Sequence, residues 1–188
     1  MFQAKHSAIN AFLESSWVDS VKLALICSSL ARTHTNLDPD LACLAGLIHQ
    51  IGILPIVSYV EEHNLFDADG DAGNLQELVE FLHPQIGELL LKSWGFPEAL
   101  HKVPSEQFNY FRKSRVVDYV DIVIVARLQC CSDKGNAMAY VDRARVPAYR
   151  KLGFYDSFGR PTELAASHID TDSPVPESNP DTLAATSS

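Results

Sequence analysis

Twenty consecutive residues, from Leu41 to Val60, carry no formal charge. A membrane-spanning helix needs about 20 apolar residues, so length alone would allow a span here. The centre of the stretch, however, reads His49-Gln50-Ile51-Gly52, and Pro55 follows soon after. Polar side chains are costly at the centre of a bilayer, and proline interrupts a helix. The stretch therefore predicts two short buried helices and no membrane span.

The rest of the chain repeats this pattern of apolar helices separated by glycine and proline. Apolar spacing predicts helices over residues 17–32, 39–51, 55–64, 75–94 and 97–103. Ser15 or Ser16 can cap the first helix, and Asp38-Pro39 is a cap followed by a first-turn proline. Residues 116–128, VVDYVDIVIVARL, stay ambiguous, because their β-branched content favours a strand and their length favours a buried helix.

Charge and cysteine usage exclude several classes of protein. Fifteen Lys and Arg against 24 Asp and Glu give a formal net charge of -9, with no basic stripe, which argues against nucleic-acid binding. The four cysteines, at 27, 43, 130 and 131, lack the Cys-x-x-Cys spacing of a zinc or redox site. The sequence shows no secretory signal peptide. We therefore expect a cytoplasmic protein.

The two ends of the chain differ from its middle. Residues 1–16 predict an N-terminal helical extension, and residues 17–155 predict one helical domain. Residues 156–188 are rich in Ser, Pro and Asp, which predicts a largely disordered acidic tail. A polar loop is expected over residues 67–73.

Four segments resemble a known family. Residues 45–52, Ala-Gly-Leu-Ile-His-Gln-Ile-Gly, resemble the Ala-Gly-Leu-Leu-His-Asp-Ile-Gly signature of HD-superfamily phosphohydrolases. Residues 83–97 resemble the next element of the HDOD and HD-GYP branches, residues 17–20 resemble the Trp-x-His-Ser start of an HDOD helix, and residues 145–153 fit the end of the domain. The chain thus resembles a degenerate HDOD domain without its N-terminal half. The resemblance implies an all-α, HD-domain-like helical bundle, and it favours helix for residues 116–128.

The resemblance also implies a metal site, in which two histidines and two aspartates bind a divalent cation that activates water against a phosphoester. At these positions this chain has Asp19, His49, Gln50 and Arg127, and His83 is expected to face the same pocket. Gln50 is a poorer ligand than a carboxylate. Arg127 places a permanent positive charge where the cation would lie. We therefore expect the metal site to be lost, with an Asp19–Arg127 ion pair in its place.

These features favour a non-catalytic signalling module of bacterial type, which acts through contacts with a protein partner or a second copy and needs no cofactor. Two alternatives stay open. One is a metal-dependent phosphohydrolase that holds one divalent metal with an altered ligand set of Asp19, His49 and His83. The other is a sensor of a small nucleotide or phosphate, which Arg127 and Gln50 would recognise.

Overall fold

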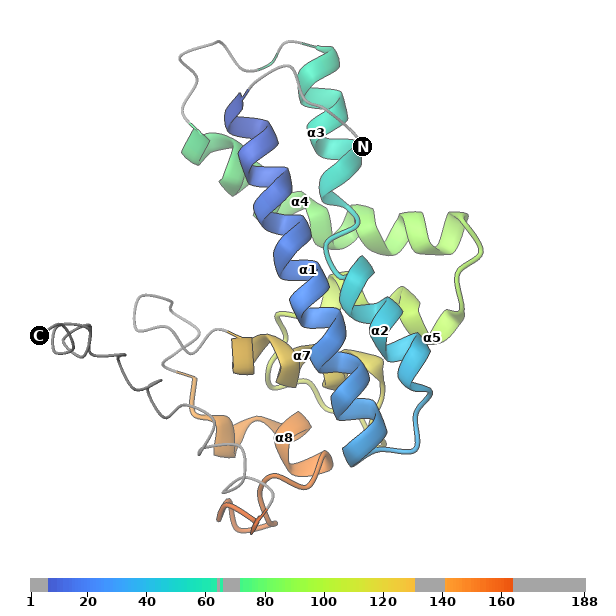
Figure 1. Cartoon of the computed structure of the whole chain (residues 1–188), viewed down its shortest axis with the longest axis vertical. Helices are drawn as coiled ribbons and strands as arrows, with labels where there is room; N and C mark the ends of the chain where they lie inside the picture. The colour runs from blue at the N-terminus through green and yellow to red at the C-terminus, as the bar shows by residue number, and fades with distance from the viewer. Residues whose placement is uncertain (1–6, 64, 66–71, 131–140, 164–188) are drawn as a thin grey trace, which may run out of the picture.

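The computed structural model describes residues 7–63, 65, 72–130 and 141–163, and over these ranges the chain is an all-α bundle apart from one isolated bridge between Tyr155 and Pro161. The elements in chain order are α1 (Ser7–His34), α2 (Pro39–Ile48), α3 (Ile53–Glu62), α4 (Ala72–Ser93), α5 (Glu98–His101), α6 (Val103–Glu106), α7 (Tyr119–Cys130), the 3-10 helix η2 (Arg143–Arg145) and α8 (Pro147–Lys151) (Figure 1). The all-α fold expected from the sequence is confirmed.

Helix α1 is longer than its sequence pattern predicted. It begins at Ser7 and continues through Ser15 and Ser16, so the predicted cap at these serines is wrong. The helix continues because Ile9, Phe12 and Leu13 extend its apolar face and pack against α3 and α4. Residues 7–16 of the predicted extension and the first helix of the domain are therefore one element, with no break between residues 16 and 17.

The uncharged stretch folds into two helices, as predicted. Asp38 begins α2, since its carboxylate accepts hydrogen bonds from the backbone N–H of Asp40 at 2.8 Å and of Leu41 at 3.4 Å. A turn at residues 49–52 separates α2 from α3. By length and composition, residues 39–62 pass as a membrane span with a mean hydropathy of 1.9, yet half of the apolar window is buried inside the domain. Burial in the core explains the lack of charge.

Two glycines allow backbones to touch around this turn. A Cβ atom added at Gly46 would lie 2.5 Å from the Cα atom of Ala24 in α1, and one added at Gly52 would lie 2.2 Å from the carbonyl oxygen of His83 in α4. Neither separation is sterically possible, so only glycine fits at these crossings. The close approach at Gly52 brings the turn that carries His49 and Gln50 directly against α4.

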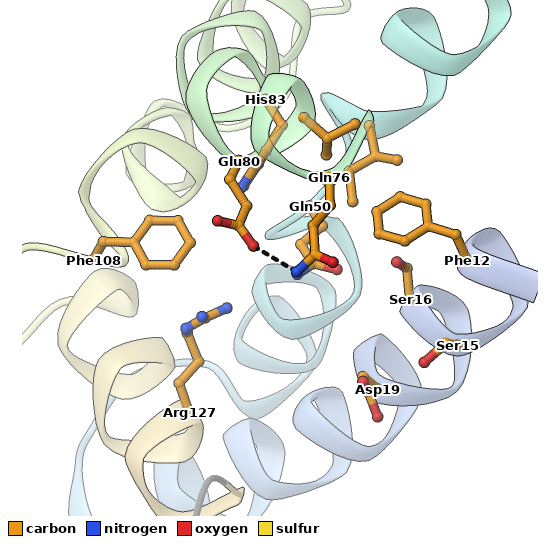
Figure 2. A pocket seen from close by; sticks show the side chains of 12 residues that line it. Phe12, Ser15, Ser16, Asp19, Gln50, Gln76, Glu80, His83, Phe108 and Arg127 are labelled. Atoms are coloured by element: carbon orange, nitrogen blue, oxygen red, sulfur yellow. Dashed lines mark hydrogen bonds between the residues drawn. The ribbon is translucent and has the colours of Figure 1, made fainter. Parts of the chain in front are cut away.

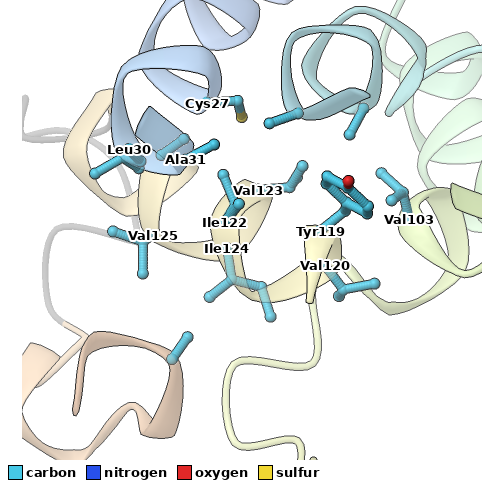
Figure 3. Close-up of a cluster of buried hydrophobic side chains, with 14 of the residues drawn as sticks. Cys27, Leu30, Ala31, Val103, Tyr119, Val120, Ile122, Val123, Ile124 and Val125 are labelled. Carbon is cyan, nitrogen blue, oxygen red and sulfur yellow. The ribbon is translucent and has the colours of Figure 1, made fainter. Parts of the chain in front are cut away.

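Helix α7 lies at the centre of the larger of two apolar clusters. Every residue from Tyr119 to Leu128 is buried, and side chains such as Cys27 and Leu30 of α1 pack over it (Figure 3). A helix that is buried all round has no amphipathic period, which is why the sequence pattern left residues 116–128 ambiguous. The helix implied by the family resemblance is confirmed.

The second apolar cluster joins the N-terminal half of α1 to α3 and the first half of α4. Its buried members are Ile9, Ile53, Ile56, Val57, Val60, Leu75 and Val79. The domain therefore has two cores, and α1 contributes to both.

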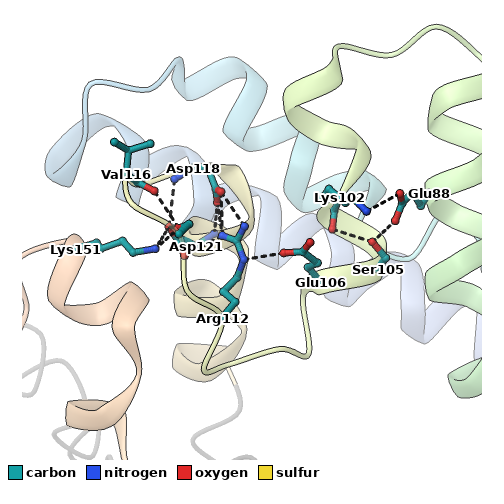
Figure 4. A network of polar contacts seen from close by, with 10 residues as sticks. Glu88, Lys102, Ser105, Glu106, Arg112, Val116, Asp118, Asp121 and Lys151 are labelled. Atoms are coloured by element: carbon teal, nitrogen blue, oxygen red, sulfur yellow. Dashed lines mark hydrogen bonds and ion pairs between the residues drawn. The ribbon is translucent and has the colours of Figure 1, made fainter.

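A dense polar network fixes the N-terminal end of α7 (Figure 4). The carboxylate of Asp121, which is fully buried, pairs with Arg112 at 3.1 Å and with Lys151 at 2.6 Å, and it accepts a hydrogen bond from Ser114 at 3.2 Å. Arg112 also pairs with Asp118 at 2.7 Å. The network ties α7 to the preceding loop and to α8.

The predicted tail begins inside an ordered turn. The Asp156 carboxylate accepts from the backbone N–H of Phe158 at 2.8 Å and of Arg160 at 2.9 Å, and Thr162 donates to the carbonyl oxygen of Gly153 at 2.6 Å. The boundary at residue 156 therefore falls seven residues before the described part of the chain ends at 163. Residues 164–188 and most of the predicted loop at 67–73 lie outside the described residues.

Candidate functional site

A pocket of about 580 Å³ opens between the two apolar clusters. Four parts of the chain line it (Figure 2). They are α1, the α2–α3 turn with the start of α3, α4, and α7 together with Phe108, which follows α6. Its lining residues are Phe12, Ser15, Ser16, Asp19, Gln50, Ile53, Gln76, Val79, Glu80, His83, Phe108 and Arg127. The pocket is therefore polar on several sides although it lies between apolar cores.

Arg127 is held rigidly at one side of this pocket. Its side chain is buried, and Nη1 donates a 2.9 Å hydrogen bond to Oε1 of Gln107. The guanidinium carbon lies 4.5 Å from the centre of the Phe108 ring, within the range of a cation–π contact. Gln107 is fully buried and donates through Nε2 to the carbonyl oxygens of His49, at 2.6 Å, and Pro104. Arg127 is thus linked through Gln107 to the α2–α3 turn.

His49 lies just behind the pocket wall. Its Nδ1 atom is 2.7 Å from the carbonyl oxygen of Gly46. A carbonyl only accepts, so Nδ1 carries the hydrogen and Nε2 holds the lone pair. Burial, together with the positive charge of Arg127, lowers the pKa of His49 to about 3. The imidazole is therefore neutral at physiological pH.

His83 lines the pocket from α4 and is 2% exposed. Its ring meets the Phe108 ring edge-on with 5.8 Å between centroids. Within the described part of the chain, its buried Nδ1 atom has no hydrogen-bond partner. Burial and then the charge of Arg127 lower the pKa of His83 to about 4. Two neutral histidines therefore flank one fixed cation.

Asp19 lies at the solvent edge of the same pocket. Its side chain is 65% exposed and pairs with Lys22 one turn further along α1, at 3.7 Å. The predicted Asp19–Arg127 ion pair is wrong, because Arg127 is directed to Gln107 and Phe108 instead. Figure 2 shows the two side chains on separate sides of the pocket.

Amide and carboxylate groups fill the space between these sides. Gln50 lines the pocket, and its buried Oε1 atom has no hydrogen-bond partner among the described residues. On α4, Nε2 of Gln76 donates to Oε1 of Glu80 at 2.9 Å (Figure 2). Unlike Gln50, these two residues were not anticipated from the sequence.

The structure brings the five predicted positions together. Asp19, Gln50, His83 and Arg127 line one pocket, and His49 lies behind it close enough for its pKa to respond to Arg127 and His83. Sequence reasoning missed Gln107 and Phe108, which lie in a short segment after α6 that carries no recognisable motif.

A metal site in a protein needs several donor side chains close to one point. Over residues 7–63, 65, 72–130 and 141–163, no three or more His, Cys, Asp or Glu side chains gather closely enough to hold a metal ion. Among the cysteines within these ranges, Cys27 is buried and Cys130 is exposed. Burial strongly raises the pKa of the Cys27 thiol, which keeps it protonated.

The site combines residues from three parts of a helical bundle: His49 after α2, His83 on α4 and Arg127 late on the buried helix α7. This arrangement is that of HD-type domains. The family model of the HDOD domain matches residues 1–109, which is more than half of the chain. The chain therefore belongs to the HDOD domain family.

Two solved structures share this fold. A "Putative metal-dependent phosphohydrolase" from Shewanella amazonensis SB2B is 23% identical, with a TM-score of 0.65 over 80% of this chain and 54% of that chain. A "Putative phosphohydrolase" from the same organism is 18% identical, with a TM-score of 0.52 over 92% of this chain and 63% of that one. The chain thus spans less than two thirds of either neighbour. No curated protein matches it.

Proposed function

We propose that this protein is a non-catalytic HDOD module that works in cytoplasmic signalling by binding another protein, and that its HD metal site is lost. The observation that carries the loss of the metal site and of catalysis is the position of Arg127. A buried, permanently charged guanidinium at the position of a metal-ligating aspartate opposes a divalent cation, because two positive charges repel strongly where water is excluded.

The remaining donors support the same conclusion. Asp19 is mostly exposed and paired with Lys22, and Gln50 offers only a neutral amide. Divalent cations that activate water favour carboxylate and imidazole ligands gathered at one point. These side chains do not fit such a cation, so no hydrolytic step is derived for the chain.

The proposal that the module binds a protein rests on an exposed apolar stripe of α1. Trp17, Val18, Val21 and Leu25 are 62%, 48%, 36% and 66% exposed. At about 100° per residue these four side chains fall within one arc of roughly 100°. Large apolar side chains grouped in this way mark a contact surface. The occupant that fits it is an amphipathic helix, which would lay its apolar face along the stripe.

Metal binding tests the loss of catalysis. The purified protein is incubated with Mn²⁺, Fe²⁺, Zn²⁺ or Mg²⁺, its metal content is measured after removal of free ions, and hydrolysis of phosphodiesters and nucleotides is assayed. We expect less than stoichiometric metal and no turnover. Near-stoichiometric metal that is lost in His49→Ala would instead favour the phosphohydrolase with ligands Asp19, His49 and His83.

The docking surface is tested by substitution. We expect Trp17→Ser/Leu25→Ser to abolish binding of the cognate partner, or dimerisation if sedimentation shows the stripe to be covered by a second copy, without lowering the thermal midpoint. Phe81→Ser is the matched control, because Phe81 is 74% exposed on α4 and lies outside the stripe. Equal loss of binding in the control would contradict the proposal.

A further inference from the structure

The pocket keeps polar groups that neither the fold nor the docking stripe uses. Arg127 enters it on one side beside Phe108, while Asp19 and Ser16 line the other side and Glu80 lies between them (Figure 2). Asp19 and Glu80 are exposed, so this side of the pocket is open to solvent, whereas Arg127 and the Oε1 atom of Gln50 are buried. A volume of about 580 Å³ is also within the range of small-molecule sites, roughly 300–1,000 Å³.

The Arg127 side is prepared for an oxyanion. Gln107 and the face of Phe108 fix the guanidinium before any ligand arrives, so little conformational entropy is lost when an anion binds. Guanidinium groups recognise carboxylate and phosphate through paired hydrogen bonds. The two neighbouring histidines are neutral, with pKa values lowered to about 3 and about 4, and leave Arg127 as the cation that faces the pocket.

The remaining polar groups of the pocket can accept hydrogen bonds. Glu80 and Asp19 present carboxylates, which accept hydrogen bonds when ionised. The buried Oε1 atom of Gln50 is likewise an acceptor without a partner in the described structure. A simple anion would meet two carboxylates here. A ligand that carries hydroxyl or ammonium groups away from its anionic end would satisfy these acceptors.

We propose that the pocket binds a small polar metabolite with one oxyanion group, which Arg127 holds directly without a metal, and with hydroxyl or ammonium donors that meet Glu80, Asp19 and Gln50. The ligand would contact α1, α4 and α7 at once and so bridge the two apolar cores. Its site on α1 is on the side opposite the Trp17–Leu25 stripe, as Phe12, Ser16 and Asp19 are about half a turn away from that arc. Ligand and partner can therefore bind the same helix together.

Calorimetric titration of the full chain in the presence of EDTA tests the proposal. Inorganic phosphate and acetate are bare oxyanions, glycerol 3-phosphate and serine add donors to a phosphate and to a carboxylate, and glycerol and ethanolamine are donors alone. We expect glycerol 3-phosphate or serine to bind at least about tenfold more tightly than the matching bare oxyanion and than either donor probe. Which of the two binds identifies the oxyanion as phosphate or carboxylate.

Variants assign the binding to this pocket. Arg127→Gln should lower affinity by about tenfold or more, since it removes a charge-assisted contact, while Arg150→Gln on the exposed face of α8 should not change it. Ser16→Phe fills the pocket and leaves the contacts of Arg127 intact, so it decides the question if Arg127→Gln fails to fold.

Binding that survives Ser16→Phe would overturn the inference. Failure of both glycerol 3-phosphate and serine to bind would also overturn it. The inference rests on the metal-free part of the proposed function. Stoichiometric metal would defeat both, whereas absence of metal together with absence of oxyanion binding would defeat the inference alone.

Discussion

The two ends of α7 each carry a buried charge, and the groups that surround the two charges differ. Asp121, at the N-terminal end, is 0% exposed and is surrounded by two cations, a hydroxyl and a backbone N–H (Figure 4). Arg127, near the C-terminal end, meets a neutral amide oxygen and an aromatic ring beside an open pocket. Both charges have the sign that the helix dipole favours. The Asp121 end is built to hold elements together, whereas the Arg127 end keeps polar capacity for a ligand.

The largest effect is expected at the Asp121 end. Asp121→Ala leaves Arg112 and Lys151 without their shared carboxylate, and both are largely buried, with side-chain exposures of 12% and 17%. Removing one partner of a buried ion pair costs about 3–5 kcal/mol. We expect a loss of unfolding free energy of this size in urea denaturation.

Arg160→Gln is the control for this variant. Arg160 pairs with Asp156 but is 74% exposed, so its loss should cost less than about 1 kcal/mol. Equal effects of the two substitutions would remove the contrast between a buried network and a surface pair.

A smaller effect is expected at the other end. Arg127→Met retains much of the apolar stem but deprives Oε1 of Gln107 of its donor, which costs about 1–3 kcal/mol. The variant should also raise the pKa of His83 towards its usual range, because the positive charge of Arg127 contributes to lowering it. NMR titration of the imidazole signals measures this shift. An unchanged pKa would show that burial alone sets it.

The pH dependence of stability should arise at the Arg127 end. His49 and His83 have folded-state pKa values of about 3 and about 4, below the usual 6.5, so the unfolded chain takes up protons first as the pH falls. Stability is therefore full above pH 6.5 and declines below it, by up to about 1.4 kcal/mol per pH unit for each histidine.

Urea midpoints at pH 7.5 and pH 5 measure this decline, and His83→Gln should reduce it. His63→Gln, at an exposed position after α3, is the control and should leave the slope unchanged. A slope that His83→Gln does not alter would place the source of acid sensitivity elsewhere.

The smallest effect is expected where a partly buried carboxylate has exposed partners. Glu88 accepts from Lys92, Ser105 and Lys102, and although partial burial opposes it, these bonds lower its pKa to about 2. Lys102 is 57% exposed, so Lys102→Met should lower stability only slightly, and the effect should shrink in high salt. A loss as large as that of Asp121→Ala would contradict the ranking by burial.

The sequence predicted those parts of the fold that local chemistry controls. Asp38 begins α2 through its own carboxylate, and the break near Gly52 follows from a turn that only glycine fits. The start of α1 was missed because Ser15 and Ser16 look like caps, while Ile9 and Phe12 bury against helices distant in sequence. Tertiary packing overrode the local signal there.

The candidate site was predictable in position but not in contacts. The motif around His49 and the spacing to His83 and Arg127 located the pocket. The expected Asp19–Arg127 pair failed because side-chain direction depends on the rotation of α1 about its axis, which no motif fixes. Gln107 holds Arg127 from 20 residues away, and a single glutamine in a turn carries no pattern that would announce this.

Helix α7 has no exposed face between Tyr119 and Leu128. Its backbone amides should therefore exchange with solvent deuterium only when the whole domain unfolds, and they should report the global free energy of unfolding. Under the signalling role proposed above, we expect a ligand to shift α1 and α4 rather than the buried α7. Deuterium uptake that changes on α1 and α4 upon ligand addition, while α7 stays silent, would be the signature of such a response.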